Sequence, residues 1–123
     1  VTDQDLPLLY RAADFSIVPS SAYEGFGLII LESLASGTPA LGTPVAAIPE
    51  VLRPFDESLL LEGATPAHLA DGMSEVLSGE RKLPGMTDCE AYVIERFAWP
   101  VVVSRINSVY HDVLGMAHRN AEN

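Results

Sequence analysis

Two glutamates, Glu24 and Glu32, lie eight positions apart within residues 20–37, which read SSAYEGFGLIILESLASG. An apolar run ends at Pro19, a small glycine-containing loop carries Glu24, and Glu32 falls on the helix that we expect to follow. Carboxylates accept charge-assisted hydrogen bonds from neighbouring hydroxyl groups, such as those of a sugar or a ribose. The pattern therefore indicates a pair of acids suited to a polyhydroxylated, phosphorylated ligand.

The backbone at the start of this helix offers a second kind of contact. Helix N-termini present N–H groups without intrahelical partners and the positive end of the helix dipole, so they bind phosphate groups. Gly25 and Gly27 allow the main chain to approach a ligand closely. The N–H groups of Phe26, Gly27 and Leu28 are therefore candidate phosphate donors.

Spacing alone does not separate these acids from ordinary solvated side chains, because acids eight positions apart are common. Glu32 has one further property, which is the apolar character of its helix. A helix so apolar on several faces is expected to be buried, and a buried carboxylate needs a partner. The apolar neighbours of Glu32 are Leu28, Ile29, Ile30, Leu31 and Leu34.

The elements that must position these residues alternate between short apolar runs and amphipathic helices. Alternation of this kind predicts a parallel sheet in a doubly wound α/β fold, whose ligands bind beyond the carboxyl ends of the strands. Three short strands are few for such a sheet, so we expect further strands upstream. We expect strands at 15–18, 38–42 and 59–61, and helices capped near residue 2 or 3 and at about 27–36, 50–52, 66–77, 87–95 and 100–114.

Several side chains carry more specific packing expectations. Thr87 is expected to cap the fifth of these helices, and Trp99 is expected to lie in the core. Cys89 has no neighbouring histidine, which favours a packed or surface thiol over a nucleophile. Residues expected to face inward from the helix after Thr65 are Leu69, Met73, Val76 and Leu77, and those expected to form an apolar face on the last helix are Val102, Ile106, Val109, Tyr110 and Val113.

Composition bounds the remaining possibilities. The 123 residues carry a formal net charge of −10 with only seven Lys and Arg, which argues against a nucleic-acid partner. One cysteine fits a reducing compartment, and no apolar run could cross a bilayer, so we expect a cytoplasmic protein that could also lie peripherally at the inner membrane face. His68, His111 and His118 lack metal-ligand spacing, and we expect no bound metal.

The stretch from Glu24 through Leu28 to Glu32 resembles the E-x7-E signature of family 4 retaining glycosyltransferases, also called glycosyltransferase group 1. Other segments resemble the family in order and spacing. They are Leu8-Leu9-Tyr10-Arg11-Ala12-Ala13-Asp14, Pro19-Ser20, Gly37-Thr38-Pro39, Ile48-Pro49-Glu50-Val51, and Phe97-Ala98-Trp99 with Tyr110.

The resemblance implies the GT-B architecture, in which two Rossmann-like domains face a cleft. Residues 1–115 would then be the later part of the C-terminal nucleotide-sugar-binding domain, a partial three-layer fold of short parallel strands with flanking helices, and residues 116–123 a polar tail. The implied reaction is hexosyl transfer (EC 2.4) from a UDP-, GDP- or ADP-sugar with retention at the anomeric carbon. No cofactor besides this nucleotide-sugar donor is implied.

The resemblance also assigns roles to residues. It implies that Glu24 is catalytic and contacts the donor sugar, and that Glu32 contacts the nucleotide ribose. The loop from Gly25 through Phe26 and Gly27 to Leu28 would contact the sugar and phosphate region.

Two departures from the family pattern leave alternatives open. Ala46-Ala47 stands where the family often has Gly-Gly, and the basic residues that hold the diphosphate would lie upstream, with the N-terminal acceptor domain. We therefore expect this chain to be inactive alone. Because a sheet without its first strands has an open edge and an uncovered helix face, we also expect the chain to self-associate or to pair with the upstream part of the protein. The alternatives are a non-catalytic glycosyltransferase-like module for binding or assembly, and a nucleotide-sugar epimerase of doubly wound fold.

Overall fold

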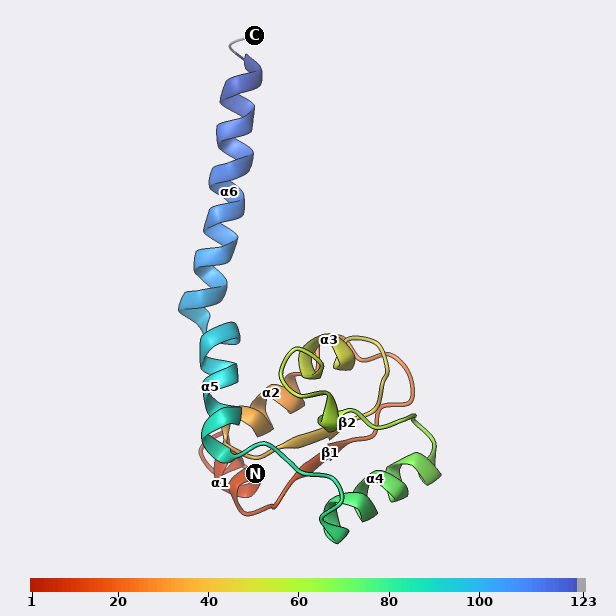
Figure 1. Cartoon of the computed structure of the whole chain (residues 1–123). Helices are drawn as coiled ribbons and strands as arrows, with labels where there is room; N and C mark the ends of the chain where they lie inside the picture. The colour runs from red at the N-terminus through yellow and green to blue at the C-terminus, as the bar shows by residue number, and fades with distance from the viewer. Residues whose placement is uncertain (122–123) are drawn as a thin grey trace.

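The computed structural model describes the backbone of residues 1–121 and the side chains of residues 1–115, and it has the expected α/β fold. A rounded body holds the strands and most helices, and one long helix projects from it (Figure 1). The elements in chain order are α1 (Leu6–Arg11), β1 (Ser16–Val18), α2 (Leu28–Ala35), β2 (Ala40–Gly42), α3 (Ile48–Leu52), the 3₁₀ helix η1 (Glu57–Leu59), α4 (Pro66–Ser78), α5 (Met86–Phe97) and α6 (Trp99–Ala121).

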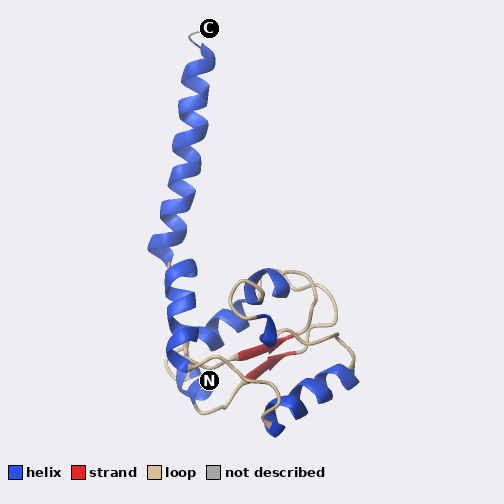
Figure 2. Cartoon of the chain, viewed as in Figure 1, coloured by secondary structure: helices blue, strands red, loops and turns tan. Residues whose placement is uncertain are grey.

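The two strands pair in parallel at the centre of the body (Figure 2). Ser16 lies opposite Ala40 and Val18 lies opposite Gly42. Helix α2 connects the strands and contacts both of them, and α3 contacts β2. Every residue of β2 is buried, as expected for a parallel strand covered by helices. The predicted strands at 15–18 and 38–42 are thus confirmed, each somewhat shorter than expected.

The third predicted strand, 59–61, is wrong as a strand. The chain forms η1 up to Leu59, and Leu60 is extended and joined to Gly42 by a single parallel bridge. The side chain of Asp56 accepts a hydrogen bond from the N–H of Ser58 over 2.9 Å, which caps the 3₁₀ turn. This local hydrogen bond competes with strand pairing, so only the end of the apolar run reaches the sheet.

The core lies between the strands and helices α2, α3 and α5. Cys89 is buried in it, as a packed thiol should be. The hydroxyl group of Tyr92 donates to the main-chain oxygen of Val51 over 2.6 Å, and the Tyr92 ring stacks on Phe55 with centroids 4.5 Å apart. The buried apolar side chains are Val18, Ile30, Leu31, Leu34, Ala40, Leu41, Ile48, Val51, Leu52, Leu59, Leu61, Cys89 and Tyr92.

Helix α2 ends at Ala35, one residue earlier than the sequence predicts, and its C-cap Ser36 directly precedes Gly37. Gly37 has φ = +81°, a left-handed conformation that terminates helices and favours glycine. A Cβ atom on Gly37 would lie 2.4 Å from Cγ of Met86, so α5 packs directly on this turn. The glycine therefore serves both the helix end and the contact between α2 and α5.

Helix α4 begins after an N-cap at Thr65, as predicted. The Thr65 side chain accepts a hydrogen bond from the N–H of His68 over 3.3 Å, and Pro66 occupies the first turn. Leu69 and Val76 pack against the core as expected, whereas Met73 and Leu77 are exposed. The helix covers the body along one narrow stripe only, so the expectation that all four residues face inward is wrong.

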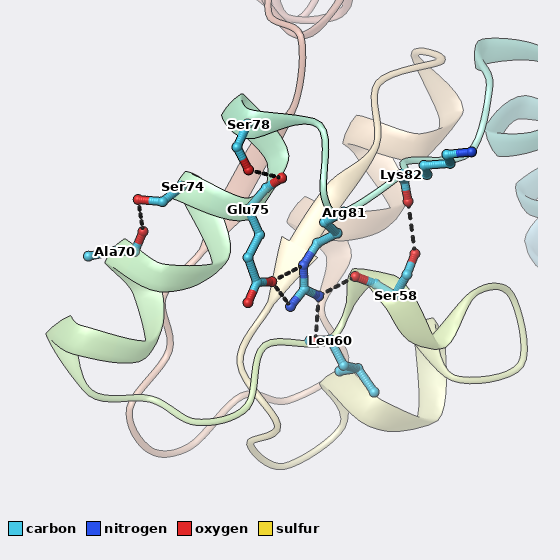
Figure 3. Close-up of polar contacts among 8 residues, drawn as sticks. All are labelled: Ser58, Leu60, Ala70, Ser74, Glu75, Ser78, Arg81 and Lys82. Carbon is cyan, nitrogen blue, oxygen red and sulfur yellow. Dashed lines mark hydrogen bonds and ion pairs between the residues drawn. The ribbon is translucent and has the colours of Figure 1, made fainter.

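A polar clamp joins α4 to η1 (Figure 3). The guanidinium group of Arg81 donates to Oε2 of Glu75 over 2.6 and 2.8 Å, and it also donates to the main-chain oxygens of Ser58 and Leu60. Arg81 is largely buried, and these acceptors satisfy its charge and its donors. The clamp fixes the segment from Ser58 to Leu60, which includes the bridge residue, against α4.

Helices α5 and α6 meet at a one-residue break. Ala98 has φ = −59° and ψ = 140°, so the helical hydrogen bonding stops there and restarts at Trp99. Helix α5 begins at Met86 after an N-cap at Gly85, so the predicted cap at Thr87 is wrong. The side chain of Arg105 spans the break by donating to the main-chain oxygen of Arg96 over 3.2 Å.

Helix α6 is longer than the predicted 100–114 and carries its apolar side chains into solvent. Trp99 is 79% exposed, so its placement in the core is wrong, because it begins a helix that leaves the body. The predicted apolar face exists, and its exposed members are Ile106, Val109, Tyr110 and Val113, with Val102 half-buried. Of the helices that the structure describes, none has the length and apolar character needed to cross a membrane.

Candidate functional site

The loops that follow β1 and β2 are tied together at the carboxyl edge of the sheet. The hydroxyl group of Thr43, just after β2, donates to the main-chain oxygen of Ser20, just after β1, over 2.6 Å. The N–H of Thr43 donates to the oxygen of Val18 over 3.3 Å. Thr43 is fully buried, so this link holds both loops in place at the edge where open α/β sheets bind ligands.

Glu24 lies in the first of these loops, half-buried, with its carboxylate against the start of α2. Oε1 accepts from the N–H of Gly27 over 3.2 Å, and Oε2 accepts from the hydroxyl group of Ser20 over 3.2 Å. A negative charge at a helix N-terminus is favoured by the helix dipole. Glu24 thus orders the loop in this structure, and its neighbour Tyr23 adopts φ = +48° to allow the turn.

The start of α2 presents main-chain donors, as predicted. Gly27 is the N-cap residue with φ = +80°, a conformation that favours glycine, and its N–H is used by Glu24. Within residues 1–121, the N–H groups of Phe26, Leu28 and Ile29 donate to no protein acceptor. Two of the three predicted donors, Phe26 and Leu28, are therefore available to an anion, together with Ile29, which the sequence analysis did not single out.

Glu32 is exposed, so the predicted burial of this carboxylate is wrong. Ile30, Leu31 and Leu34 are buried in the core, whereas Leu28 and Ile29 are exposed. With about 3.6 residues per turn, Glu32 falls on the side of α2 away from the core.

The expectation that Glu32 needs a partner is nevertheless met. The hydroxyl group of Tyr10, on α1, donates to its Oε2 over 3.2 Å. Burial of the phenol, and then the negative charge of Glu32, raise the pKa of Tyr10.

Glu32 and Tyr10 line an open cavity of about 490 Å³ between α1 and α2. Arg11, a basic residue on its wall, is engaged with protein partners. It donates to the main-chain oxygen of Ser36 over 3.1 Å and pairs with Glu90 over 2.9 Å. The remaining lining residues are Asp3, Leu6, Pro7, Ala35 and Ser36.

The two glutamates therefore occupy different positions along α2. Glu24 lies before the first turn, at the loops that follow the strands, while Glu32 lies on the flank that faces α1. Tyr10 and Thr43 are partners of this region that no sequence pattern indicates. Neither carries a spacing signal, because each contact joins residues more than twenty positions apart.

A second, apolar cavity of about 290 Å³ adjoins the start of α2. Phe26 and Leu28 form one wall, and Phe97 and Trp99, at the break between α5 and α6, form the other. The rings of Phe26 and Phe97 meet edge-to-face with centroids 6.0 Å apart. Phe26 thus anchors the loop to α5 through its side chain, while its N–H has no protein acceptor among the described residues.

The loop after β2 contains the Ala46-Ala47 pair. Ala46 has φ = +49°, in the left-handed region that favours glycine, and Ala47 is the N-cap residue of α3 with φ = −77°. The position at which glycine is frequent in the resembling family is thus one that requires a glycine-like backbone, and alanine adopts it here at some cost.

The helix N–H groups without protein acceptors and the tied loops thus lie at the carboxyl edge of a parallel sheet, which is the edge at which open α/β folds bind ligands. The family is established by comparison: the model of the family "Glycosyl transferases group 1" matches residues 1–95. The chain belongs to this family of glycosyltransferases. Membership in this family favours a glycosyltransferase over the epimerase alternative.

Relatives support the same assignment. The chain is 34% identical over 110 residues to a D-inositol 3-phosphate glycosyltransferase of Thermobispora bispora, covering 89% of this chain and 26% of that protein. It is 36% identical over 95 residues to an N-acetyl-alpha-D-glucosaminyl L-malate synthase of Bacillus anthracis, covering 76% of this chain and 25% of that protein. The chain thus spans about a quarter of the length of these relatives.

A solved structure has the same fold. Sucrose-phosphate synthase from Thermosynechococcus elongatus superposes with a TM-score of 0.76 at 24% identity, over 94% of this chain and 29% of that chain. The expected fold, a fragment of a GT-B glycosyltransferase with short parallel strands and flanking helices, is confirmed.

Proposed function

We propose that this chain is the donor-binding part of a retaining hexosyltransferase that uses a nucleoside-diphosphate sugar. The observation that carries the proposal is the arrangement around α2. Glu24 and the free N–H groups lie at its start, and Glu32 lies on its exposed flank beside a cavity. A donor lying along α2 would meet an acid for the sugar, helix N–H groups for the phosphates and an acid for the ribose.

In this proposal the residues keep the roles inferred from the resemblance. Glu24 contacts the donor sugar and is the catalytic residue. Gly25, Phe26, Gly27 and Leu28 form the main-chain contacts. Because Glu24 now accepts the N–H of Gly27 and the hydroxyl group of Ser20, binding of a sugar hydroxyl would add to or replace one of these bonds.

The whole reaction requires parts that this chain does not supply. Arg11, on the wall of the Glu32 cavity, is paired with Glu90, so we infer that cations for the diphosphate come from the rest of a longer polypeptide. The same polypeptide would supply the acceptor domain, and the isolated chain would be inactive. We infer no cofactor besides the nucleotide sugar.

The test uses the full-length protein and calorimetric titration with UDP, GDP, ADP and their sugars. Glu32→Ala should abolish or strongly weaken binding of the preferred nucleotide, because the ribose hydroxyls lose their charged acceptor. Unchanged affinity in this variant would refute the ribose assignment. Glu62, an exposed acid on the loop before α4, provides a matched control as Glu62→Ala, which should leave affinity unchanged.

A second measurement separates the two acids. Glu24→Ala should lower kcat more than it weakens nucleotide binding, since its proposed partner is the sugar and not the nucleotide. Turnover equal to that of the unaltered protein would reject the sugar role. The anomeric configuration of the product, read by NMR, tests retention directly, and an inverted product would overturn that part of the proposal.

A non-catalytic binding or assembly module is the second candidate function. It is favoured by the methyl group of Ala46, which lies in a left-handed loop position where it can hinder close approach of a donor. Binding of a nucleotide without any transfer or hydrolysis of its sugar by the full-length protein would favour this candidate over the enzyme.

The exposed apolar side chains of α6 support a further expectation about partners. Side chains such as Ile106, Val109 and Val113 are more than 45% exposed, and contiguous apolar surface of this kind favours association. We infer that the isolated chain self-associates, or pairs with the rest of the longer polypeptide. A monodisperse monomer in light scattering would contradict self-association.

A further inference from the structure

The Glu32 carboxylate has a single hydrogen-bond partner among the described side chains, and that partner is Tyr10. The bond runs from the Tyr10 hydroxyl group to Oε2 over 3.2 Å and joins α1 to α2, 22 positions apart in sequence. No positively charged side chain in the described part of the chain forms an ion pair with Glu32. The orientation of this carboxylate therefore depends on one neutral donor.

An exposed glutamate side chain samples several rotamers, and ordering it on ligand binding costs conformational entropy. The bond from Tyr10 limits these rotamers before any ligand arrives. It occupies Oε2 and leaves Oε1 without a protein partner in the described structure. A carboxylate held in this way loses less conformational entropy when it accepts hydrogen bonds from two vicinal hydroxyl groups than a freely rotating carboxylate would.

Tyr10 is itself held in place. The hydroxyl group of Thr38, a buried residue after α2, donates to the main-chain oxygen of Tyr10 over 2.7 Å. The next residue, Arg11, donates to the main-chain oxygen of Ser36 over 3.1 Å. Both bonds fasten the end of α1 to the end of α2, so the Tyr10 ring has a fixed base from which to reach Glu32.

The protonation state of Tyr10 suits a donor. Burial, and secondly the Glu32 charge, raise its pKa from the ordinary value of 10.0, so the phenol keeps its proton at neutral and mildly alkaline pH. The hydroxyl group therefore remains available at neutral pH to donate to the Glu32 carboxylate.

We propose that Tyr10 is a positioning residue for nucleotide binding, which holds the Glu32 carboxylate in the orientation that accepts the two ribose hydroxyl groups. This inference rests on the proposed function, in which Glu32 binds the ribose of the donor. Tyr10 acts through Glu32, and it adds no direct contact with the reacting atoms.

The test compares the full-length protein with its Tyr10→Phe variant, which keeps the ring and removes the hydroxyl group. Calorimetry with UDP, GDP and ADP identifies the nucleotide that binds the unaltered protein. Loss of one net hydrogen bond corresponds to about three- to tenfold in affinity. We expect that weakening in Kd and in KM for the donor, with kcat nearly unchanged. Tyr110→Phe, at an exposed position on α6, is the matched control and should bind as the unaltered protein does.

Two further readouts separate positioning from a structural role. In the Glu32→Ala background, Tyr10→Phe should cause no additional loss, because its effect passes through the missing carboxylate. The preference for the ribonucleotide over its 2′-deoxy form should also shrink in Tyr10→Phe. Additive losses, or an unchanged 2′-deoxy preference, would overturn the inference.

The failures of the inference and of the proposed function can be told apart. Strong weakening by Glu32→Ala together with full affinity in Tyr10→Phe refutes the role of Tyr10 and leaves the proposed function standing. If none of the three nucleotides binds the unaltered protein, or if Glu32→Ala has no effect, then the proposed function fails and the inference about Tyr10 fails with it.

Discussion

Replacing Ala46 by glycine should stabilise the chain, which is opposite to the usual effect of this substitution. Ala46 has φ = +49°, and a residue with a Cβ atom adopts this region at a cost of roughly 1–2 kcal/mol relative to the right-handed conformation. Glycine removes that cost, but it also gives the unfolded chain more conformational freedom, which opposes the gain by about 0.4–1 kcal/mol. We therefore expect Ala46→Gly to raise the free energy of unfolding by about 0.5 kcal/mol.

The matched control is Ala70→Gly, an exposed position inside α4 with ordinary helical geometry. Glycine there should lower the free energy of unfolding by about 1 kcal/mol. The two variants should thus differ by about 1.5 kcal/mol with opposite signs, although the substitution is the same.

Urea denaturation followed by far-UV circular dichroism measures both variants against the unaltered chain. Trp99 is a poor fluorescence probe for this purpose because it is already 79% exposed in the folded state. If Ala46→Gly lowered the stability as much as Ala70→Gly does, the left-handed strain attributed to Ala46 would be refuted. A changed urea dependence with an unchanged midpoint would instead indicate altered compactness of the unfolded chain.

Three further predictions follow from the packing around α5. Gly37→Ala should lower the free energy of unfolding by about 2 kcal/mol or more, because the new Cβ atom adds left-handed strain and lies 2.4 Å from Cγ of Met86. A loss below about 0.5 kcal/mol in urea denaturation would contradict this expectation. Tyr92→Phe should cost about 1–3 kcal/mol, because it leaves the buried main-chain oxygen of Val51 without its donor at 2.6 Å, and an unchanged urea midpoint would argue against it. Burial, and then the neighbouring Asp88, raise the pKa of Cys89 from 9.0 to about 11, so the native thiol should resist iodoacetamide at pH 8 and react once urea unfolds the chain. Since the unfolded chain releases this proton near pH 9 and the folded chain near pH 11, the contribution of Cys89 to stability is present below pH 9 and is lost as the pH rises to 11.

The sequence predicts the element boundaries that are set by residues with special backbone or capping preferences. Pro19 marks the end of β1 because proline fixes its own φ and lacks an N–H group, and Gly37 marks the end of α2 because glycine readily adopts the left-handed conformation. Thr65 and Pro66 define the start of α4 for the same reason. These signals act within a few residues, so the sequence alone carries them.

The same reasoning fails where distant residues decide the structure. The apolar run at 59–61 is typical of a strand, but the 3₁₀ turn capped by Asp56 takes up Leu59, so that only Leu60 forms a bridge to the sheet. Glu32 was expected to be buried because its helix is apolar on several faces, yet Leu28 and Ile29 are exposed with it. Periodicity describes the sides of a helix and does not say which of them a given chain covers.

The candidate site contains features that nearby residues determine and features that distant residues determine. The placement of Glu24 and the helix N–H groups follows from the order strand, loop and helix, which the sequence predicts. The Tyr10 bond to Glu32 and the Thr43 bond to Ser20 join separate elements, so they become visible only in three dimensions.

The break at Ala98 makes α6 a lever arm. Helix α6 has 23 residues and, at about 1.5 Å per residue, is roughly 35 Å long. A rotation of only about 10° at Ala98 would therefore move its far end by about 6 Å, while the first turn hardly shifts. Phe97, on the body side of this pivot, touches the Phe26 ring in the loop that carries Glu24. The backbone angles of Ala98 set the direction of α6. The adjacent residue, Phe97, contacts the loop at the start of α2 through Phe26.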